Sequence, residues 1–216
     1  MSVLSKKDIL KNIKTGGLNF DPEIDAFQLQ PHSVDLRLGH TFYIGKTWEV
    51  TQKGRTSMNV DYLNNIANKN YFEIIELNPG QYFDILPGEY VIAQTMETIQ
   101  VKNLKMMGML FPRSSFNRRG LSVDISGVID SGYSGTLMIP IQNNTTSQSI
   151  RIYPGERICQ VMFMELTTKL NPEEAAITTV DRGKDSSNTF TKLERDEEKR
   201  YILEGRVGDL KKDYNL

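Results

Sequence analysis

The sequence has only one cysteine, Cys159, and two histidines, His32 and His40. A single thiol excludes an internal disulfide and a zinc site built from several cysteines. The two histidines lie eight residues apart, which is not the spacing of paired metal ligands. The H-x-E and P-C-x-x-C signature of zinc-dependent base deaminases is therefore absent.

A strong charge of one sign and long apolar runs are also missing. The formal net charge is -1, so no bulk basic field attracts a polyanion, and we expect no nucleic-acid partner. No apolar run approaches the roughly 20 residues of a membrane span, and the first residues lack the apolar core of a signal peptide. We therefore expect no membrane partner and a cytoplasmic location, which also suits a lone cysteine.

Short apolar runs between turns dominate the chain of 216 residues. Pro-Gly pairs at 79–80, 87–88 and 154–155 mark three of these turns. The pattern predicts a mainly β protein, folded as a distorted β-barrel or jelly roll. The expected strands cover 33–38, 42–44, 71–77, 82–86, 90–93, 106–111, 136–141, 150–153 and 158–164.

Two helices are expected near the ends of the chain. Ser5 and Asp8 form a capping-box pattern, and the short helix that follows ends at Gly16. Dense mixed charge over 192–201 predicts a peripheral C-terminal helix.

The composition divides the chain into two parts. Residues 1–170 are predicted to form the β domain, and the polar, irregular stretch 46–70 is an excursion from it with room for a short helix at 60–67. Residues 171–216 form a C-terminal lid segment and a charged tail. Within this part, 181–192 is polar and contains Gly and Ser, so we expect a mobile lid there.

The most informative stretch begins at residue 112. Arg113, Arg118 and Arg119 lie with two serines within seven residues, a density suited to binding an anion. Asp130 then follows an apolar run and precedes a Gly-rich turn at 131–135. A carboxylate at the end of an apolar strand is poorly solvated, and general bases are tuned in such places. Both features also have a simpler interpretation. The cluster of Arg and Ser can be a solvated turn, and Asp130 can be only a turn-forming residue.

Residues 1–165 resemble the superfamily of trimeric dUTP diphosphatases and dCTP deaminases. The motifs PHSVDLRLG at 31–39 and PGEYVIA at 87–93 are similar to the deaminase branch. PRSS at 112–115 and PGERICQ at 154–160 are shared by both branches. The resemblance implies a β-barrel-like fold and a homotrimer whose active sites lie between subunits.

The two branches differ in the proton carrier that deamination requires. Deaminases have a Glu five residues after the Gly that closes the turn; here that Gly is Gly135, and the position holds Pro140. No carboxylate occurs from 131 to 149, whereas GVIDSGYSG at 127–135 is similar to the diphosphatase motif. Because proline cannot carry a proton, this favours triphosphate cleavage over deamination.

The resemblance also implies roles for single residues. Asp130 matches the general base that activates water for attack at the α-phosphorus. Tyr133 matches a ring that packs against deoxyribose, with a core aromatic as the alternative. The residues matched to phosphate contacts are Arg113, Ser114, the deaminase-type Ser115, Gln160, and Arg118, which would reach a neighbouring subunit's site.

Uracil is expected against a β-hairpin at 121–127, where the contacts would be Asp124, Ser126 and Gly127. Asp124 stands where some diphosphatases have Asn, and a carboxylate there can accept from uracil N3–H. Asp35 matches an Asp near a Mg²⁺ ion, which it would reach through water. Alternatively, Asp35 holds Arg113 by a buried ion pair.

The C-terminal segment offers two further matches. Arg182 is matched to a contact with the γ-phosphate and Phe190 to a cover over the base, although the spacing is longer than in the diphosphatase motif and its later glycines are missing. Mg²⁺ would be held mostly by triphosphate oxygens and water.

Together these matches predict a homotrimeric dUTP diphosphatase that hydrolyses dUTP to dUMP and pyrophosphate with Mg²⁺. Two alternatives stay open. One is a dCTP deaminase, mono- or bifunctional, with an unrecognised proton carrier. The other is a non-catalytic nucleotide-binding regulator, which the residues Ser115 and Asp124 and the altered C-terminal motif would suit.

Overall fold

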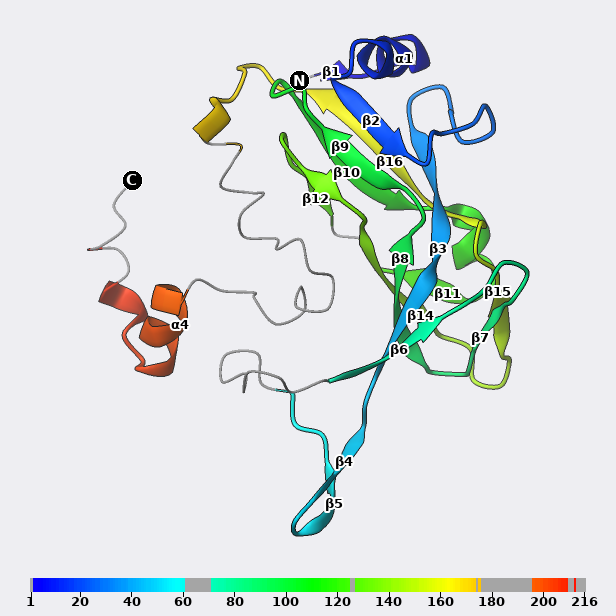
Figure 1. Ribbon diagram of the computed structural model, residues 1–216, viewed down its shortest axis with the longest axis vertical. Coiled ribbons are helices and arrows are strands. Elements are labelled where there is room, and N and C mark those ends of the chain that lie inside the picture. Colours follow the sequence, from blue (N-terminus) through cyan, green and yellow to red (C-terminus); the bar gives the residue numbers. More distant parts are fainter. Residues whose placement is uncertain are drawn as a thin grey trace. The chain divides into compact units, whose positions relative to one another are not determined.

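The computed structural model describes residues 2–60, 71–124, 127–173, 175, 196–209 and 212. The chain divides into two compact units, Met1–Gly45 with Phe72–Thr179, and Lys46–Tyr71 with Val180–Leu216. The two-part division expected from composition, with a boundary near residue 170, stays a prediction. Figure 1 shows the elements of each unit.

The described elements follow in chain order. They are β1 (Ser2–Val3), α1 (Lys6–Lys14), β2 (Leu18–Asp21), β3 (Val34–Gly45), β4 (Trp48–Thr51), β5 (Gly54–Ser57), β6 (Phe72–Glu76), β7 (Phe83–Ile85), β8 (Tyr90–Thr95), β9 (Thr98–Val101), β10 (Met106–Pro112), α2 (Ser114–Asn117), β11 (Leu121–Val123), β12 (Val128–Ile129), β13 (Ser134–Gly135), β14 (Met138–Asn143), β15 (Ile150–Ile152), β16 (Arg157–Glu165), α4 (Asp196–Leu203) and the 3-10 helix η1 (Val207–Asp209).

The first unit is built on a curled antiparallel sheet of nine strands. Its order is β11-β14-β8-β3-β16-β10-β12, with β1 beside β16 and β6 beside β3. A three-stranded sheet, β13-β9-β2, and a two-stranded sheet, β15-β7, complete this unit. The prediction of a mainly β, barrel-like fold with a short N-terminal helix is therefore confirmed.

The long strand β3 connects the core to the polar face of the sheet. Val34, Leu36 and Leu38 are fully buried on its core side. Side chains alternate between the two faces of a strand, so Asp35 and Arg37 point to the other face. The core thus fixes where the polar groups of β3 can lie, and these groups take part in the candidate site described below.

Helix α1 forms as the sequence predicts. Ser5 is its N-cap, and the capping box is complete, because the Ser5 hydroxyl accepts from Asp8 N while the Asp8 carboxylate accepts from Ser5 N at 3.1 Å. The apolar face buries Ile9 completely. The chain leaves the helix through Gly16, which has a positive φ of 72°.

The stretch 46–70 differs from the irregular excursion that we expected. Strands β4 and β5 form a hairpin in which Trp48 pairs with Ser57. The guanidinium of Arg55 lies 4.8 Å from the centre of the Trp48 ring, a cation–π contact that a scan for apolar alternation does not detect. The helix considered at 60–67 lies, apart from residue 60, outside the described residues.

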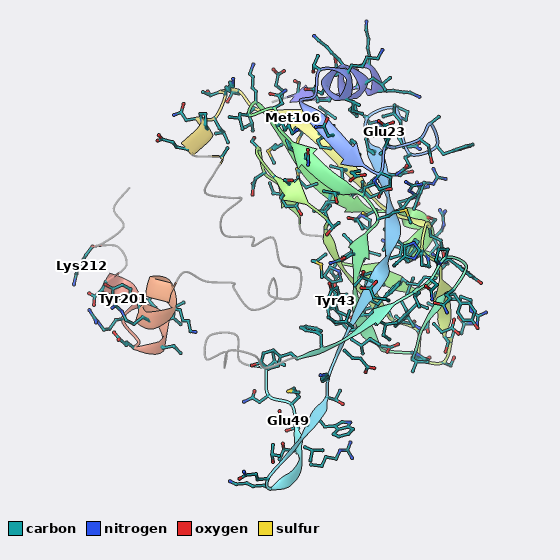
Figure 2. The ribbon with its side chains drawn as sticks, viewed as in Figure 1. Glu23, Tyr43, Glu49, Met106, Tyr201 and Lys212 are labelled. Carbon is teal, nitrogen blue, oxygen red and sulfur yellow. The ribbon has the colours of Figure 1, made fainter. Side chains whose placement is uncertain are left out.

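The expected C-terminal helix is present as α4 in the second unit. Tyr201 of this helix (Figure 2) is buried, and the Arg206 guanidinium lies 5.2 Å from the centre of its ring. Across the described part of the chain, no helix combines the length and the apolar character needed to cross a membrane.

The single cysteine provides a test of the core. Cys159 is fully buried in β16, and burial raises the pKa of its thiol. Both effects suppress reaction with thiol reagents, which require an accessible thiolate. We predict that the native protein at pH 8 does not react with a disulfide reagent such as Ellman's reagent, and that one thiol per chain reacts in guanidinium chloride. A rapid reaction of the native protein would contradict the burial of this strand.

Candidate active site

Strand β16 lies between β3 and β10 and brings residues from three distant segments together. In this register Gln160 pairs with Asp35 on one side and with Phe111 on the other. Arg113 follows β10 directly, and its backbone N–H donates to Ile158 O at 3.2 Å. The predicted phosphate-contacting residues Arg113 and Gln160 therefore lie on neighbouring strands, beside Asp35.

A β-bulge in β16 adds Arg157 to this group. Arg157 pairs with Arg37 and Cys159 with Leu36, so Ile158 is an extra residue without a partner in β3. A regular strand would place Arg157 and Gln160 on opposite faces, because they are three residues apart. The extra residue puts both on the polar face. Bulges of this kind commonly re-aim a side chain next to a functional site.

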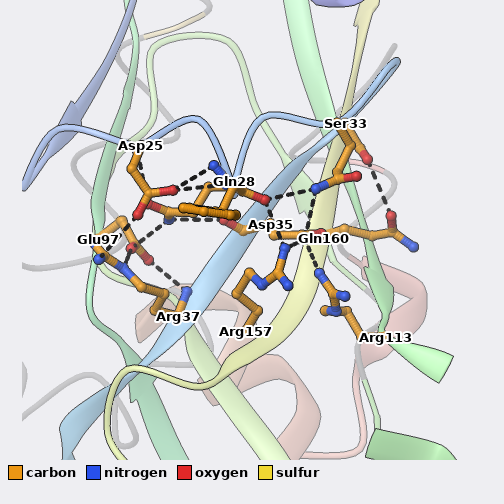
Figure 3. Close-up of polar contacts among 11 residues, drawn as sticks. Asp25, Gln28, Ser33, Asp35, Arg37, Glu97, Arg113, Arg157 and Gln160 are labelled. Carbon is orange, nitrogen blue, oxygen red and sulfur yellow. Dashed lines mark hydrogen bonds and ion pairs between the residues drawn. The ribbon is translucent and has the colours of Figure 1, made fainter. Parts of the chain in front are cut away.

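The carboxylate of Asp35 is the centre of the group (Figure 3). It is 1% exposed, yet its Oδ2 atom forms ion pairs with Nη1 of both Arg113 and Arg157, the latter at 3.1 Å. Gln30 Nε2 donates to the same oxygen at 3.3 Å. Burial and the neighbouring Arg157 guanidinium lower the pKa of Arg113. A buried carboxylate requires such partners, because an unpaired charge in the interior is very costly.

A second buried carboxylate, Glu97, supports the same strand. It is fully buried and accepts from the backbone N–H of Arg37 at 2.8 Å and from Arg37 Nε at 2.6 Å. Gln28 links the two carboxylate groups, because its Nε2 donates to Glu97 Oε1 at 2.8 Å and to the backbone oxygen of Asp35 at 3.0 Å. Asp35, Glu97 and Gln28 thus form a connected polar network beneath the arginines of this face.

Asp130 and Tyr133 lie in a tight turn after β12. Tyr133 N donates to Asp130 O at 3.1 Å, and Gly132 has the positive φ of 86° that the third residue of a type II turn requires. Tyr133 is buried in the core, and its hydroxyl donates to Thr136 O at 2.7 Å. Within one chain, Tyr133 is thus a core aromatic, the alternative left open above, and Asp130 is half-buried at the mouth of the turn.

The turn and the arginine group lie at opposite ends of β10. Ser131 Oγ donates to the carbonyl of Met106, the first residue of β10, whereas Arg113 follows its last residue. Ile129 pairs with Gly108, five residues before Arg113. At about 3.3 Å per residue, this gives a separation of roughly 17 Å. One chain therefore does not bring Asp130 and Arg113 to the same reacting atom.

The hairpin expected to bind the base places Asp124 opposite Pro140. Val123 pairs with Ile141 across β11 and β14, and the next residue along, Asp124, donates its backbone N–H to Pro140 O at 3.2 Å. Both Val123 and Ile141 are buried, so Asp124 and Pro140 share the opposite face. Asp124 is exposed there. Because Pro140 has no N–H to donate in return, this pair is joined by one backbone hydrogen bond.

The structure also locates the remaining predicted residues. Ser114, Ser115 and Arg118 are exposed in and after α2, beside Arg113. Gly127 is close-packed, because a Cβ there would lie 2.5 Å from Leu110 Cδ1. The other predicted contacts, Ser126, Arg182 and Phe190, lie outside the described residues.

A metal ion held by Asp35 does not fit this arrangement. Two guanidinium groups bind the same carboxylate oxygen and would repel a divalent cation. Among the described residues, no group of three or more His, Cys, Asp and Glu side chains has the arrangement to hold a metal ion. Of the two roles considered for Asp35, the structure shows the ion pair with Arg113.

Comparison with known proteins identifies the family. The chain belongs to the superfamily of dUTPases and dCTP deaminases. Within it, residues 3–166, well over half of the chain, match the dCTP deaminase-like family, and the chain therefore belongs to that family.

Curated relatives carry a more specific name. A protein of Methanosphaera stadtmanae is 32% identical over 169 residues, 78% of this chain and 81% of the relative, and is named "dCTP deaminase, dUMP-forming". A relative of the same name from Sulfurihydrogenibium sp. is 32% identical over 195 residues, 90% of this chain and 99% of the relative.

A solved structure, the 2'-deoxycytidine 5'-triphosphate deaminase from Agrobacterium tumefaciens, has a similar fold, with a TM-score of 0.57 and 24% identity. The match covers 82% of this chain and 53% of that one, so the chain spans about half the length of the solved protein.

These relatives show that the main functional prediction from the sequence, a dUTP diphosphatase, is wrong. The curated relatives are named as deaminases of dCTP, which was the first alternative. The prediction gave decisive weight to the missing carboxylate at Pro140. It did not consider that the strand paired with β14 carries a carboxylate, Asp124, on the same face.

Sequence reasoning missed the most connected residues of the site. Arg157 and Arg37 were read only as parts of motifs, and Glu97 was not considered at all. A signal for Arg157 was present, because Arg-Ile-Cys-Gln places two apolar residues between two polar ones, a pattern that fits a bulge better than a regular strand. Nothing local in the sequence indicates that Glu97 is buried beneath Arg37.

The turn that carries Asp130 can be tested through Gly132. Its φ of 86° is strained for any residue with a Cβ, and an added Cβ would lie 3.1 Å from Ala175 Cβ. We predict that Gly132→Ala lowers the free energy of unfolding by about 1–2 kcal/mol in urea titrations. Gly45→Ala is the matched control, because its Cβ would meet nothing within 4 Å and its φ is not positive. Equal stability of the two variants would contradict the turn.

Proposed function

We propose that this protein deaminates dCTP and releases pyrophosphate, so that dCTP and two water molecules yield dUMP, ammonia and pyrophosphate. The names of the curated relatives supply the substrate and product. The observation that carries the proposal is the position of Asp124, a carboxylate directly across the sheet from Pro140. The resemblance to deaminases places the proton carrier at the position of Pro140.

Asp124 would act as the proton carrier in the first step. Water adds to C4 of the cytosine ring, and one of its protons passes through the Asp124 carboxylate to the amine as the C4–N bond breaks and ammonia leaves. The proton left on the new C4 hydroxyl moves to N3, which gives uracil. The side chain suits this role because it is exposed on the face that it shares with Pro140. A cross-strand neighbour lies within about 5 Å at Cβ, so the same space is within reach of either position.

The triphosphate would enter as its Mg²⁺ complex, with the ion held by phosphate oxygens and water. Arg113 and Ser114, which directly follow β10, and Gln160 in the neighbouring strand β16 offer donors to the phosphates. Arginine suits this role because its planar fork can bind two phosphate oxygens at once. In the second step, Asp130 would take a proton from the water that attacks the α-phosphorus, and pyrophosphate would leave.

The proposed site requires more than one copy of the chain. Asp130 and Arg113 of one chain are separated by most of the length of β10. A homotrimer with sites between subunits, which the resemblance implies, would place Asp130 of one copy beside Arg113 of another. The exposed side chain of Arg118 would then reach the site of a neighbouring subunit.

The proposal is tested by incubating the purified protein with Mg²⁺ and either dCTP or dUTP, then measuring ammonia, pyrophosphate and nucleotide products. We expect dCTP to yield equal amounts of ammonia and dUMP. Pyrophosphate from dUTP without any ammonia from dCTP would overturn the proposal. Binding of dCTP without any product would instead indicate a nucleotide-binding regulator.

A pair of variants tests the proton carrier. We predict that Asp124→Asn slows ammonia release from dCTP by at least about a hundredfold, because the amide cannot shuttle the proton. Adding Pro140→Glu to this variant should restore part of the rate, because the new carboxylate would face the same space. Asp84→Asn is the control, since this exposed Asp pairs with Arg151 on the separate β15-β7 sheet. Deamination at the wild-type rate by Asp124→Asn would exclude Asp124 as the carrier.

A further inference from the structure

We propose that Arg157 is a second phosphate-binding guanidinium, which acts beside Arg113, and that the buried carboxylate of Asp35 positions both. The inference rests on the proposed function for the identity of the ligand, the phosphate chain of a nucleoside triphosphate. It adds Arg157 as a binding residue that neither the sequence nor the comparisons assign, and it extends the ion pair between Asp35 and Arg113, one of the two roles left open for Asp35 by the sequence, to the positioning of both arginines.

The two guanidinium groups are close because they share one atom. Nη1 of Arg113 and Nη1 of Arg157 both contact Oδ2 of Asp35 (Figure 3). The two arginines come from different segments: Arg113 follows the last residue of β10, and Arg157 is the first residue of β16. Their common contact therefore fixes the distance between the two cations, which a flexible surface pair would not do.

The carboxylates near these residues are unevenly distributed among three arginines. Arg37, the cross-strand partner of Arg157, is matched by the buried Glu97 and by Asp25, whose Oδ2 lies 3.9 Å away. Arg113 and Arg157 instead share a single carboxylate. The three arginines and three carboxylates balance in number, but two guanidinium groups face the single carboxylate of Asp35. The positive excess is therefore local to Arg113 and Arg157, where an anion would be attracted.

The positive groups are also accessible and have donors to spare. The side chains of Arg113 and Arg157 are 24% and 38% exposed, while Asp35 beneath them is 2% exposed. Arg157 uses Nη1 for Asp35 and for Phe27 O at 2.7 Å. Within the described residues its Nε and Nη2 have no hydrogen-bond partner, so these two donors are available to a ligand.

The bulge in β16 makes this arrangement possible. Gln160 accepts from Ser33 Oγ at 3.2 Å through its Oε1, and its Nε2 faces the same side of the sheet as Arg157. Without the extra residue Ile158, Arg157 would point into the core. The fold thus departs from a regular strand at the one place that gathers a third polar side chain beside Arg113 and Gln160.

Phosphate binding by Arg157 is measured with inorganic tripolyphosphate by calorimetry, which requires no turnover. We expect Arg157→Gln to raise the dissociation constant at least about tenfold, since a hydrogen bond between charged groups is lost. Arg157→Lys should have a smaller effect, because it keeps the charge and loses only the fork. The matched control, Arg151→Gln, removes an exposed arginine that is paired with Asp84 and should change the constant less than about twofold.

The role of Asp35 is tested by a result that charge alone does not predict. Removal of a negative charge in Asp35→Asn should tighten anion binding if only the net charge matters. If Asp35 positions the arginines, binding weakens instead. Asp35→Glu, which keeps the charge but shifts the carboxylate by one methylene, should weaken it too. Tighter binding by Asp35→Asn would overturn the positioning role.

Two outcomes decide the proposal as a whole. A wild-type protein that does not bind tripolyphosphate, or an Arg157→Gln variant that binds it as the wild type does, would overturn it. If tripolyphosphate binding depends on Arg157 but dCTP releases no ammonia, the phosphate site stands and the proposed reaction fails. The two proposals can therefore fail separately.

Discussion

One buried carboxylate holds the polar face of the sheet together. Asp35 is almost fully removed from solvent, and it is tolerated there because two arginines and a glutamine bind the same oxygen. These partners come from β10, from β16 and from the loop before β3. The cost of an unpaired charge in the interior thus ties three segments to one geometry. The core beneath β3 keeps this geometry in place, because it fixes which residues face the polar side.

Much of the fold can be predicted from local patterns. The capping box of α1, the Pro-Gly turns and most long strands follow from spacing and turn chemistry alone. The bulge at Ile158 does not follow from them, because its effect depends on the register of β16 against β3. The buried pairing of Glu97 with Arg37 joins residues 60 apart and has no local signal. The type of a secondary-structure element can be predicted from local sequence, whereas the pairing of residues across a sheet depends on the whole topology.

Under the proposed function, the functional prediction failed for a related reason. The absence of a carboxylate at Pro140 was taken to mean that the site has no group able to transfer a proton. In an antiparallel sheet, however, a position is defined by its face and by its cross-strand neighbours as much as by its place in the sequence. Asp124 and Pro140 are 16 residues apart in the sequence but adjacent in space. Proline in an inner strand was itself a warning, because it breaks a ladder bond that most strands keep.

The length of β10 also limits which residues of one chain can act together. Strand β10 is a rigid spacer, with the arginine group at one end and the turn of Asp130 at the other. Neither end can move toward the other without breaking the antiparallel ladder between β10 and β16. A reaction that needs both ends must therefore obtain one of them from a second molecule. Under the proposed function, each chain holds its own arginine group and its own Asp130 turn in place. The reaction at the α-phosphorus takes place only where the arginine group of one chain meets the Asp130 turn of another.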